Sequence, residues 1–159
     1  MPTLGILTAS DLGAQGKRED TSGQAIREML AAHGFTVVRY EVVPDDVQAI
    51  RKRLKEWADS GEVDLLVTTG GTGMGPRDVT PEATAGVLDR PVPGLAEAMR
   101  MQTMKLTPLS VLSRGTAGMR GRCLIINLPG SPRAVRECLE VVLPALNHAV
   151  EVLQGRQGH

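Results

Sequence analysis

The segment 70–75 is the part of this sequence best suited to hold a phosphate group, because four of its six residues are glycine. Glycine allows positive φ angles and lets backbone N–H groups approach an anion closely. A plain turn needs only one or two glycines, so four favour a bound ligand. The segment is no P-loop, because no Gly-Lys-Ser/Thr ends it, and it departs from the dinucleotide fingerprint at Pro76.

Two carboxylates follow strand-like runs and are candidates for metal chemistry. Asp78 comes just after the glycine loop, and Asp45 follows an earlier apolar run. Both also have a structural interpretation, since Asp78 stands before the helix start at Thr80, and Asp45 and Asp46 compete to cap another helix. Two carboxylates beside a glycine loop favour Mg²⁺ bound to a polyphosphate. These loops contain no histidine, so we predict metal and electrostatic catalysis, as in phosphoryl or nucleotidyl transfer.

A third candidate segment, 127–132, has the sequence Asn-Leu-Pro-Gly-Ser-Pro. Ser131 is predicted to cap a helix that has Pro132 in its first position, which leaves N–H groups free to hold an anion. The segment is equally acceptable as a bare turn, and both interpretations stay open. Isolated basic residues are more often solvated surface than phosphate clamps, and this applies to Lys105, Arg114 and Arg120.

Strand-like and helix-like runs alternate along the chain. Apolar and β-branched runs predict buried strands at 4–8, 36–43, 65–67 and 123–127. Apolar residues at helical spacing predict helices ending at Gly34 and Gly61, and further helices over 95–105 and 132–153. Thr80 is predicted to cap a helix with Pro81 in its first position. A turn between short strands is predicted over 115–121.

This alternation predicts an α/β fold with three layers, α/β/α, around a mainly parallel sheet. Ligands of such sheets bind outside the carboxyl ends of the strands, so we expect Ser10, Asp11, Asp45 and the two loops to meet at one edge. The length suits a single domain over residues 1–159. Its core is expected at about 4–153, followed by a frayed polar tail.

Composition excludes several other classes of protein. Basic and acidic residues are equal at 18 each, which argues against nucleic-acid binding, and three aromatic residues are too few to stack on bases. No apolar run is long enough to span a membrane, and residues 1–8 do not resemble a signal peptide. Cys123 and Cys138 form no CxxC pair and are predicted to be buried thiols, as in a reducing cytosol. We therefore expect a cytoplasmic protein.

Taken in order, the motifs resemble those of the molybdopterin-binding fold. They lie at 10–11, 44–46, 69–73, 77–84, 93–94, 112–114, 117–118, 120–121 and 127–132. The resemblance runs from about residue 4 to 153. In length the chain is similar to the free-standing molybdopterin adenylyltransferases of molybdenum-cofactor biosynthesis, in contrast to the multidomain proteins that insert molybdate.

The resemblance implies that the terminal phosphate of molybdopterin attacks the α-phosphate of ATP in the presence of Mg²⁺. Pyrophosphate leaves, and the adenylylated product passes to a molybdate-insertion protein. A homotrimer is also implied. Some relatives of this fold have weak or no AMP transfer, so the alternative is a non-catalytic molybdopterin carrier, although the presence of both Asp45 and Asp78 favours the enzyme. A nicotinamide dehydrogenase is disfavoured, because the fingerprint and a second domain are missing.

Carried over by position, the resemblance implies three groups of site residues. Asp78 is the main catalytic carboxylate and Asp45 the second, and both are candidate Mg²⁺ ligands. The nucleotide is expected against Gly70, Gly71, Thr72, Gly73, Ser10 and Asp11. The pterin is expected against Ser113, Asn127, Pro129, Gly130 and Ser131. Relatives vary at the position of Ser131, so Gly130 is expected to matter more.

Overall fold

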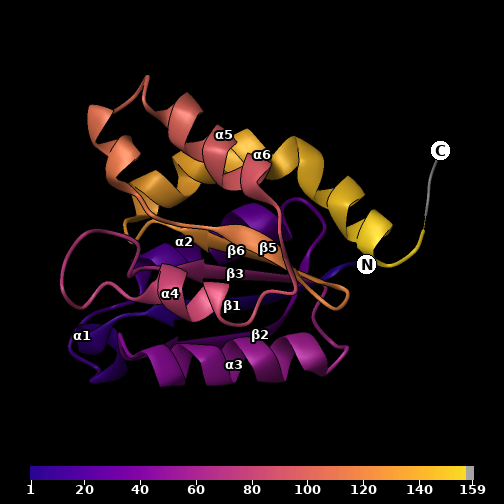
Figure 1. Cartoon of the computed structure of the whole chain (residues 1–159), viewed down its shortest axis with the longest axis horizontal. Coiled ribbons are helices and arrows are strands. Elements are labelled where there is room, and N and C mark those ends of the chain that lie inside the picture. The colour runs from indigo at the N-terminus through magenta and orange to yellow at the C-terminus, as the bar shows by residue number, and fades with distance from the viewer. Residues whose placement is uncertain (157–159) are drawn as a thin grey trace.

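The computed structural model describes residues 1–156 and has three layers, with helices on both faces of a central sheet (Figure 1). The strands are β1 (Thr3–Ala9), β2 (Thr36–Val43), β3 (Leu65–Thr69), β4 (Arg90–Pro91), β5 (Ala117–Arg120) and β6 (Cys123–Leu128). The helices are α1 (Asp11–Ala14), α2 (Thr21–Ala31), α3 (Val47–Asp59), α4 (Thr80–Ala85), α5 (Pro93–Thr103), the 3-10 helix η1 (Pro108–Leu112) and α6 (Pro132–Leu153). The predicted α/β class is confirmed.

The sheet has the strand order β2-β1-β3-β6-β5-β4. The first four strands pair in parallel, whereas β5 and β4 are antiparallel additions at one side. β3 and β6 are buried along their whole length because helices cover both faces, which explains why each contains a run of apolar residues, at 65–67 and 123–126. The mainly parallel sheet was predicted correctly.

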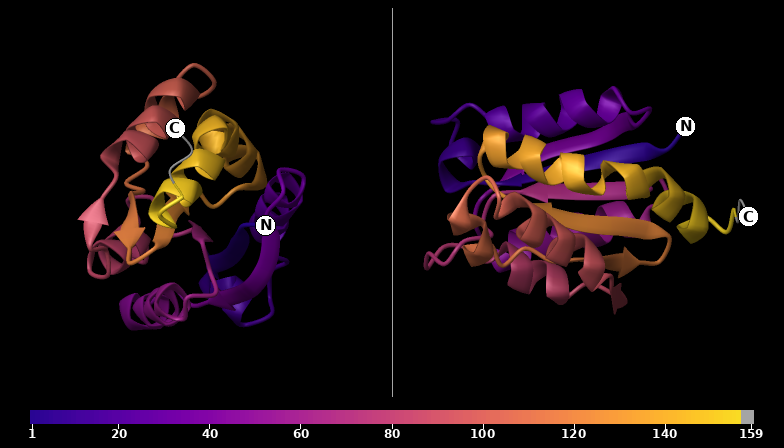
Figure 2. Two further views of the ribbon diagram at one scale, coloured as in Figure 1. Left: turned by 90° about the vertical axis from the view of Figure 1, so that its right-hand side faces the viewer. Right: turned by 90° about the horizontal axis from the view of Figure 1, so that it is seen from above.

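Each face of the sheet has its own apolar core. On one face α2, α5 and α6 pack over residues such as Ile6, Val67 and Ile126. On the other face α3 and α4 pack over Leu7 and Leu66. The left view of Figure 2 looks along the sheet and separates α3 from the helices of the opposite layer. The layers hold the sheet rigid, so the loops at its carboxyl edge project from a fixed base.

The prediction of a turn over 115–121 is wrong. Residues 117–120 form β5, which pairs with β6, and the turn lies at Gly121, whose φ is 58°. β5 was not recognised because Ala117 and Gly118 have little intrinsic preference for strands. The strand is completed by pairing with β6, a contact that local sequence does not encode.

Helix starts also differ from prediction. Thr80 is not an N-cap: it is the first residue of α4, is fully buried, and its hydroxyl donates to the Gly70 carbonyl oxygen at 2.9 Å. Asp46 caps α3 by accepting a hydrogen bond from Ala49 N, so Asp45 does not cap this helix. The short helix α1, capped by Ser10, was not predicted.

The two predicted glycine helix ends are confirmed. α3 ends at Asp59 and Gly61 follows with a φ of 75°. α2 ends at Ala31, and Gly34 closes it as a C′ glycine with a φ of 90°, because Gly34 N donates to the Ala31 carbonyl oxygen at 3.2 Å and Phe35 N to that of Leu30 at 3.0 Å. After α6, Gln154 is anchored by its amide, which donates to Asp64 at 2.8 Å, so fraying does not begin there. The rest of the predicted tail extends into 157–159, outside the described residues. Of the helices described, none is both long and apolar enough to cross a bilayer.

Candidate functional site

Two cavities lie at the carboxyl edge of the sheet, where the loops after β1, β2, β3 and β6 meet. The larger has a volume of about 500 Å³ and the smaller about 240 Å³. Gly71, Asp78 and Gly130 line both of them. Two of these three residues belong to the predicted nucleotide and catalytic groups and the third to the predicted pterin group, so the structure brings these groups together along the boundary between the cavities.

Backbone packing at this boundary requires glycine. Gly70 and Gly71 have φ angles of 91° and 69°, a region that other residues rarely adopt. A Cβ on Gly70 would lie 2.3 Å from the Ala9 carbonyl oxygen, and one on Gly71 would lie 2.3 Å from Thr80 Oγ1. A Cβ on Gly130 would lie 3.3 Å from Gly70 Cα. The ends of β1, β3 and β6 therefore approach one another more closely than side chains would allow.

Asp11 and Asp45 bind each other's backbone. Asp45 Oδ2 accepts from Asp11 N at 3.0 Å, and Asp11 Oδ1 accepts from Asp45 N at 3.0 Å. The Arg77 guanidinium donates to both Asp11 oxygens at 3.0 and 3.1 Å, and this hydrogen bonding lowers the pKa of the Asp11 carboxyl. The Asp11 charge is thus compensated by a cation, and Asp11 does not line either cavity.

Arg77 compensates Asp45 less than Asp11, because it acts on Asp45 through its charge and donates its hydrogen bonds to Asp11. Burial raises the pKa of the Asp45 carboxyl and the negative charges of Asp11 and Asp78 raise it further, while the hydrogen bond from Asp11 N and the charge of Arg77 oppose them. Asp45 lines the smaller cavity, and its Oδ1 would lie 3.2 Å from a Cβ on Gly71. A carboxylate that is partly buried beside like charges is an environment that a cation would stabilise.

The donor set at this place fits a magnesium ion only in part. Within residues 1–156, no three His, Cys, Asp or Glu side chains gather as a metal-binding group. Mg²⁺ is commonly held by one or two carboxylates, with substrate phosphates and water completing its octahedron. Asp45 and Asp78 match that minimal set, because both face the smaller cavity.

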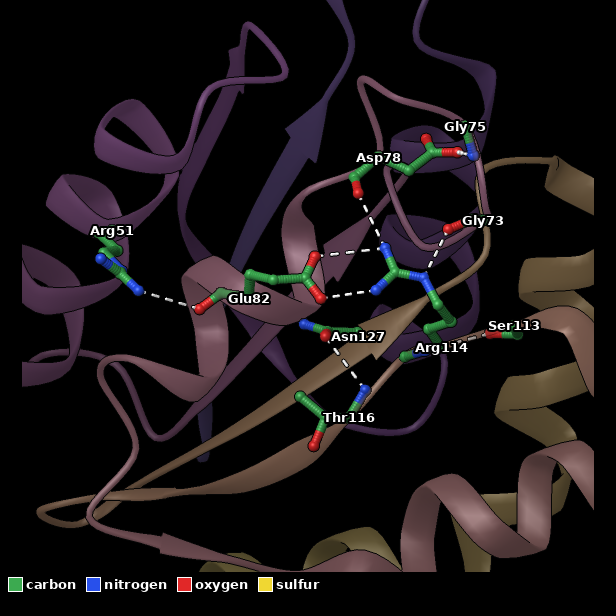
Figure 3. Close-up of polar contacts among 10 residues, drawn as sticks. Arg51, Gly73, Gly75, Asp78, Glu82, Ser113, Arg114, Thr116 and Asn127 are labelled. Carbon is green, nitrogen blue, oxygen red and sulfur yellow. Dashed lines mark hydrogen bonds and ion pairs between the residues drawn. The ribbon is translucent and has the colours of Figure 1, made fainter.

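Asp78 is held by its own loop. Its Oδ2 accepts from Gly75 N at 2.9 Å (Figure 3). Its backbone N–H donates to the Gly75 carbonyl oxygen at 3.0 Å. A Cβ on Gly73 would lie 2.9 Å from the same Oδ2, so the glycine lets the loop fold tightly around this carboxylate. The hydrogen bond of Asp78 to Gly75 replaces the helix-capping role considered from the sequence.

The larger cavity contains four of the five residues predicted for the pterin, namely Ser113, Asn127, Pro129 and Gly130. Its other walls come from α5, η1 and α6, with Met99, Leu109 and Cys138 among the lining side chains. Burial raises the pKa of the Cys138 thiol to about 11, so it remains protonated at neutral pH. Cys138 and Cys123 are both free and buried, as predicted.

Asn127 supports the wall of this cavity from within the protein. Its amide nitrogen donates to Thr68 Oγ1 at 2.9 Å and to Thr84 Oγ1 at 3.0 Å, and its Oδ1 accepts from Thr116 N at 3.1 Å. Both amide protons are thus used by the protein. Ser131 does not line the cavity, because its hydroxyl caps α6 by accepting from Ala134 N at 3.1 Å.

The smaller cavity is polar and includes residues that sequence reasoning missed. Ser10, Asp45 and Gly70 lie there as predicted, whereas Thr72 and Gly73 line the larger cavity instead. The residues not foreseen in its lining include Thr8, Arg18, Asp20 and Ser22. Asp20 caps α2 by accepting from Gly23 N at 3.0 Å, and the Asp-Thr-Ser-Gly sequence at 20–23 is a capping signal that would have located it.

The basic residues divide into two groups. Arg100 donates to the Gly115 carbonyl oxygen at 2.8 Å and Arg114 reaches the glycine loop, so both hold the loops around the larger cavity. Lys105 binds Gln102 and Arg120 binds Asp59, in both cases with side-chain atoms outside the lining of either cavity.

Comparison with known proteins identifies the family. Residues 5–148 match the model described as a probable molybdopterin binding domain. The chain is 46% identical over 154 residues to the molybdopterin adenylyltransferase of Helicobacter pylori strain J99, covering 96% of this chain and 88% of that protein. It is 38% identical over 149 residues to the Escherichia coli K12 protein of the same name, covering 92% and 76%.

Comparison with solved structures leads to the same family. The molybdopterin biosynthesis enzyme MoaB from Thermus thermophilus superposes with a TM-score of 0.92 at 56% identity, covering 98% of both chains. The tungsten cofactor synthesizing protein MoaB from Pyrococcus furiosus superposes with a TM-score of 0.87 at 35% identity, covering 99% of this chain and 98% of that one. The chain is a member of the molybdopterin-binding domain family.

Proposed function

We propose that this protein is a molybdopterin adenylyltransferase that transfers AMP from ATP to the terminal phosphate of molybdopterin and releases pyrophosphate. The observation that carries the proposal is the pair of cavities that share Gly71, Asp78 and Gly130, since a transfer reaction needs two substrates to meet at one place. The names of the curated relatives support the same activity.

Each substrate has a cavity that suits it. Molybdopterin takes the larger cavity, where the apolar side chains of Met99 and Leu109 can cover a ring system. The polyphosphate of ATP takes the polar side, against Gly70, Gly71 and Asp45. Because Thr72 and Gly73 face the larger cavity, the rest of the nucleotide crosses the boundary between the two.

The reaction forms one bond and breaks another at the α-phosphorus. An oxygen of the molybdopterin phosphate attacks in line, the bond from the α-phosphorus to the bridging oxygen breaks, and pyrophosphate leaves with those electrons. Mg²⁺, held by Asp45 and Asp78, would neutralise charge on the phosphates. The chain contributes orientation, through the glycine backbone at the boundary and the N-terminus of α6 behind Gly130. Among the described residues that line the cavities, none is histidine. A strong general base is not needed, because the attacking phosphate oxygen already carries a negative charge.

The direct test is incubation with molybdopterin, ATP and Mg²⁺, with pyrophosphate release and adenylylated molybdopterin both quantified. We expect the two products in equal amounts, and none when a chelator removes the metal. Binding of molybdopterin without pyrophosphate release would instead support the non-catalytic carrier.

Assembly and location complete the proposal. The resemblance implies a homotrimer, and assembly of subunits is supported by exposed apolar side chains between α5 and the end of η1 that line neither cavity, namely Met101, Met104, Leu106 and Val111. Light scattering would give the mass of the assembly. Two free thiols accord with a reducing cytoplasm, where the adenylylated product would be handed to a molybdate-insertion protein.

A further inference from the structure

Arg114 makes an unusual number of contacts for a partly exposed side chain at the edge of a cavity. Its Nε donates to the Gly73 carbonyl oxygen at 2.8 Å, and Nη2 donates to the Asp78 carbonyl oxygen at 2.8 Å (Figure 3). Nη1 and Nη2 donate to the two oxygens of Glu82 at 2.6 and 3.3 Å. The backbone N–H of Arg114 also donates to the Thr72 carbonyl oxygen at 2.8 Å.

These contacts occupy the guanidinium almost completely. A guanidinium has five N–H groups, and four of those on Arg114 are directed at protein acceptors. Arginines that clamp phosphate present two parallel N–H groups to the ligand. Arg114 has one left, so it is unsuited to that role even though it lies beside the glycine loop.

The contacts instead fix both ends of the loop that contains Asp78. Gly73 and Asp78 bracket the exposed residues 74–77, and Arg114 binds the carbonyl oxygen at each end of this span. Within the loop, the Asp78 side chain is bonded to Gly75 alone. Arg77 ties the exposed part of the loop to Asp11, whereas Arg114 binds the backbone at both ends of the span, including Asp78 itself. Arg114 therefore connects the loop to the segment before β5.

Glu82 holds Arg114 in its place. It lies in the first turn of α4, and its own backbone carbonyl accepts from Arg51 of α3 at 3.1 Å, so its position is fixed by two helices. Hydrogen bonding from Arg114 lowers the pKa of the Glu82 carboxyl, which keeps it charged. Without Glu82 the guanidinium would lose the carboxylate that orients its two terminal nitrogens.

We propose that Arg114 and Glu82 act as a positioning pair that holds the Asp78 carboxylate where the phosphates of the two substrates meet. The inference rests on the proposed AMP transfer for its functional consequence. Arg114 touches no substrate in this arrangement, and Glu82 contributes by fixing Arg114.

The test compares Arg114→Gln, Arg114→Lys and Glu82→Gln in steady-state AMP transfer. We expect kcat to fall between about 10- and 100-fold in the two Arg114 variants, because a displacement of about 1 Å at a reacting centre can cost about 10²-fold. KM for ATP and for molybdopterin should change little. Lysine should not rescue, since one ammonium cannot reach Gly73, Asp78 and Glu82 together. Combining Arg114→Gln with Glu82→Gln should add little to the loss caused by Arg114→Gln.

The matched control is Arg120→Gln. Arg120 also pairs with a carboxylate through two nitrogens, at 3.0 Å each to Asp59, and donates to the Val87 carbonyl oxygen at 2.9 Å, but it lines neither cavity. Its kcat should remain that of the wild type. An equal loss of kcat in Arg120→Gln would mean that Arg114 acts only through general stability and would overturn the proposal.

Hydrogen exchange provides a measurement independent of catalysis. The hydrogen-bonded amides of Gly75 and Asp78 should exchange at least about tenfold faster in Arg114→Gln than in the wild type, while amides of β3 keep their protection. Unchanged exchange in the loop would overturn the positioning role, as would full rescue by lysine or a raised KM for ATP with kcat intact. An inactive wild type would overturn the proposed function, and the exchange measurement would still decide whether the pair fixes the loop.

Discussion

The two cavities at the sheet edge share three lining residues but differ in the rest of their walls. Gly71, Asp78 and Gly130 belong to both, yet the larger is walled by α5, η1 and α6 and the smaller by the loop before α2 and by Asp45. The shared part comes from the loops that follow parallel strands ending together, whereas the differing parts come from α5, η1 and α6 for the larger cavity and from the loops around Asp20 and Asp45 for the smaller. A single sheet edge can thus bring an apolar ring and a charged polyphosphate into contact without mixing their environments.

The largest effect is expected at the boundary itself, from Asp78→Asn. The amide oxygen introduced by this substitution can still accept from Gly75 N, but one of the two negative charges that we propose hold Mg²⁺ is lost. Turnover should fall by at least about 100-fold, comparable with the loss of one preorganised electrostatic contact in other enzymes. Molybdopterin affinity should change less than twofold. Stopped assays of pyrophosphate give the rate, and fluorescence titration gives the affinity.

The control for this variant is Asp46→Asn, at the same sheet edge. Asp46 caps α3, and asparagine caps helices about as well, so folding and turnover should both be retained. Turnover in Asp78→Asn equal to that of Asp46→Asn, or undiminished activity of the wild type in excess chelator, would show that the carboxylate has no part in catalysis.

Gly71→Val tests the smaller, polar cavity, which we propose holds the polyphosphate of ATP. The side chain would point at Thr80 Oγ1 and Asp45, and the positive φ adds strain of roughly 1–3 kcal/mol. ATP affinity should fall by about tenfold or more and molybdopterin affinity by less, as measured by calorimetry. Gly34→Val is the control, since Gly34 has a φ of 90° but no atom within 4 Å of an added Cβ. Equal ATP affinity in a folded Gly71→Val protein would mean that this loop is only a turn.

Ala134→Leu tests the larger cavity, which we propose holds molybdopterin, and its expected effect is smaller. Ala134 lines the larger cavity from the first turn of α6, so leucine would fill part of the space. Molybdopterin affinity should fall roughly 3- to 10-fold, in line with about 1 kcal/mol of steric cost, and ATP affinity should hold. Ala31→Leu, on the exposed end of α2, is the control. A loss confined to ATP would reverse the assignment of the two cavities.

Gly130 is a poorer probe of that side than its position in the sequence suggests. A Cβ added to Gly130 would lie 3.3 Å from Gly70 Cα. Gly130→Val would therefore push the loop after β6 away from the glycine loop after β3 and disturb both substrates. Sequence alone places Gly130 beside the pterin. Only the packing of β6 against β3 reveals that the side chain would point toward the glycine loop.

The contrast between local sequence and tertiary packing also explains which parts of the fold and the site could be predicted. β3 and β6 each begin with an apolar run, and Asp45 and the loop of Asp78 follow strands, so the sheet edge and its carboxylates could be inferred from local pattern. β5 and the caps at Val79 and Asp46 depend on tertiary partners and were missed or left open. Arg114 was considered only as a surface residue or phosphate clamp, because its three acceptors come from residues 32 to 41 positions away.

The smallest expected effect concerns stability. It distinguishes Asp45, whose pKa is raised, from Asp59, whose pKa is lowered and which lines neither cavity. Burial raises the pKa of Asp45, so its charge destabilises the folded chain in the absence of a cation. The wild type should therefore lose stability as pH rises from the ordinary Asp value through the raised one, and Asp45→Asn should not. At pH 7 the variant should melt about 1–3 °C higher, a small change because the side chain is only half-buried and solvent screens it.

Asp59→Asn should show the opposite sign. The hydrogen bond from Arg120 lowers the pKa of Asp59, so that carboxylate stabilises the fold above the ordinary Asp value, and its contribution disappears as pH falls through the lowered one. Calorimetric melting from pH 3 to 8 would compare both variants with the wild type. If Asp45→Asn melts below the wild type at pH 7 without metal, its charge is already compensated by the protein. Asp45 would then be a structural partner of Asp11, and the metal at this edge would rest on Asp78 alone.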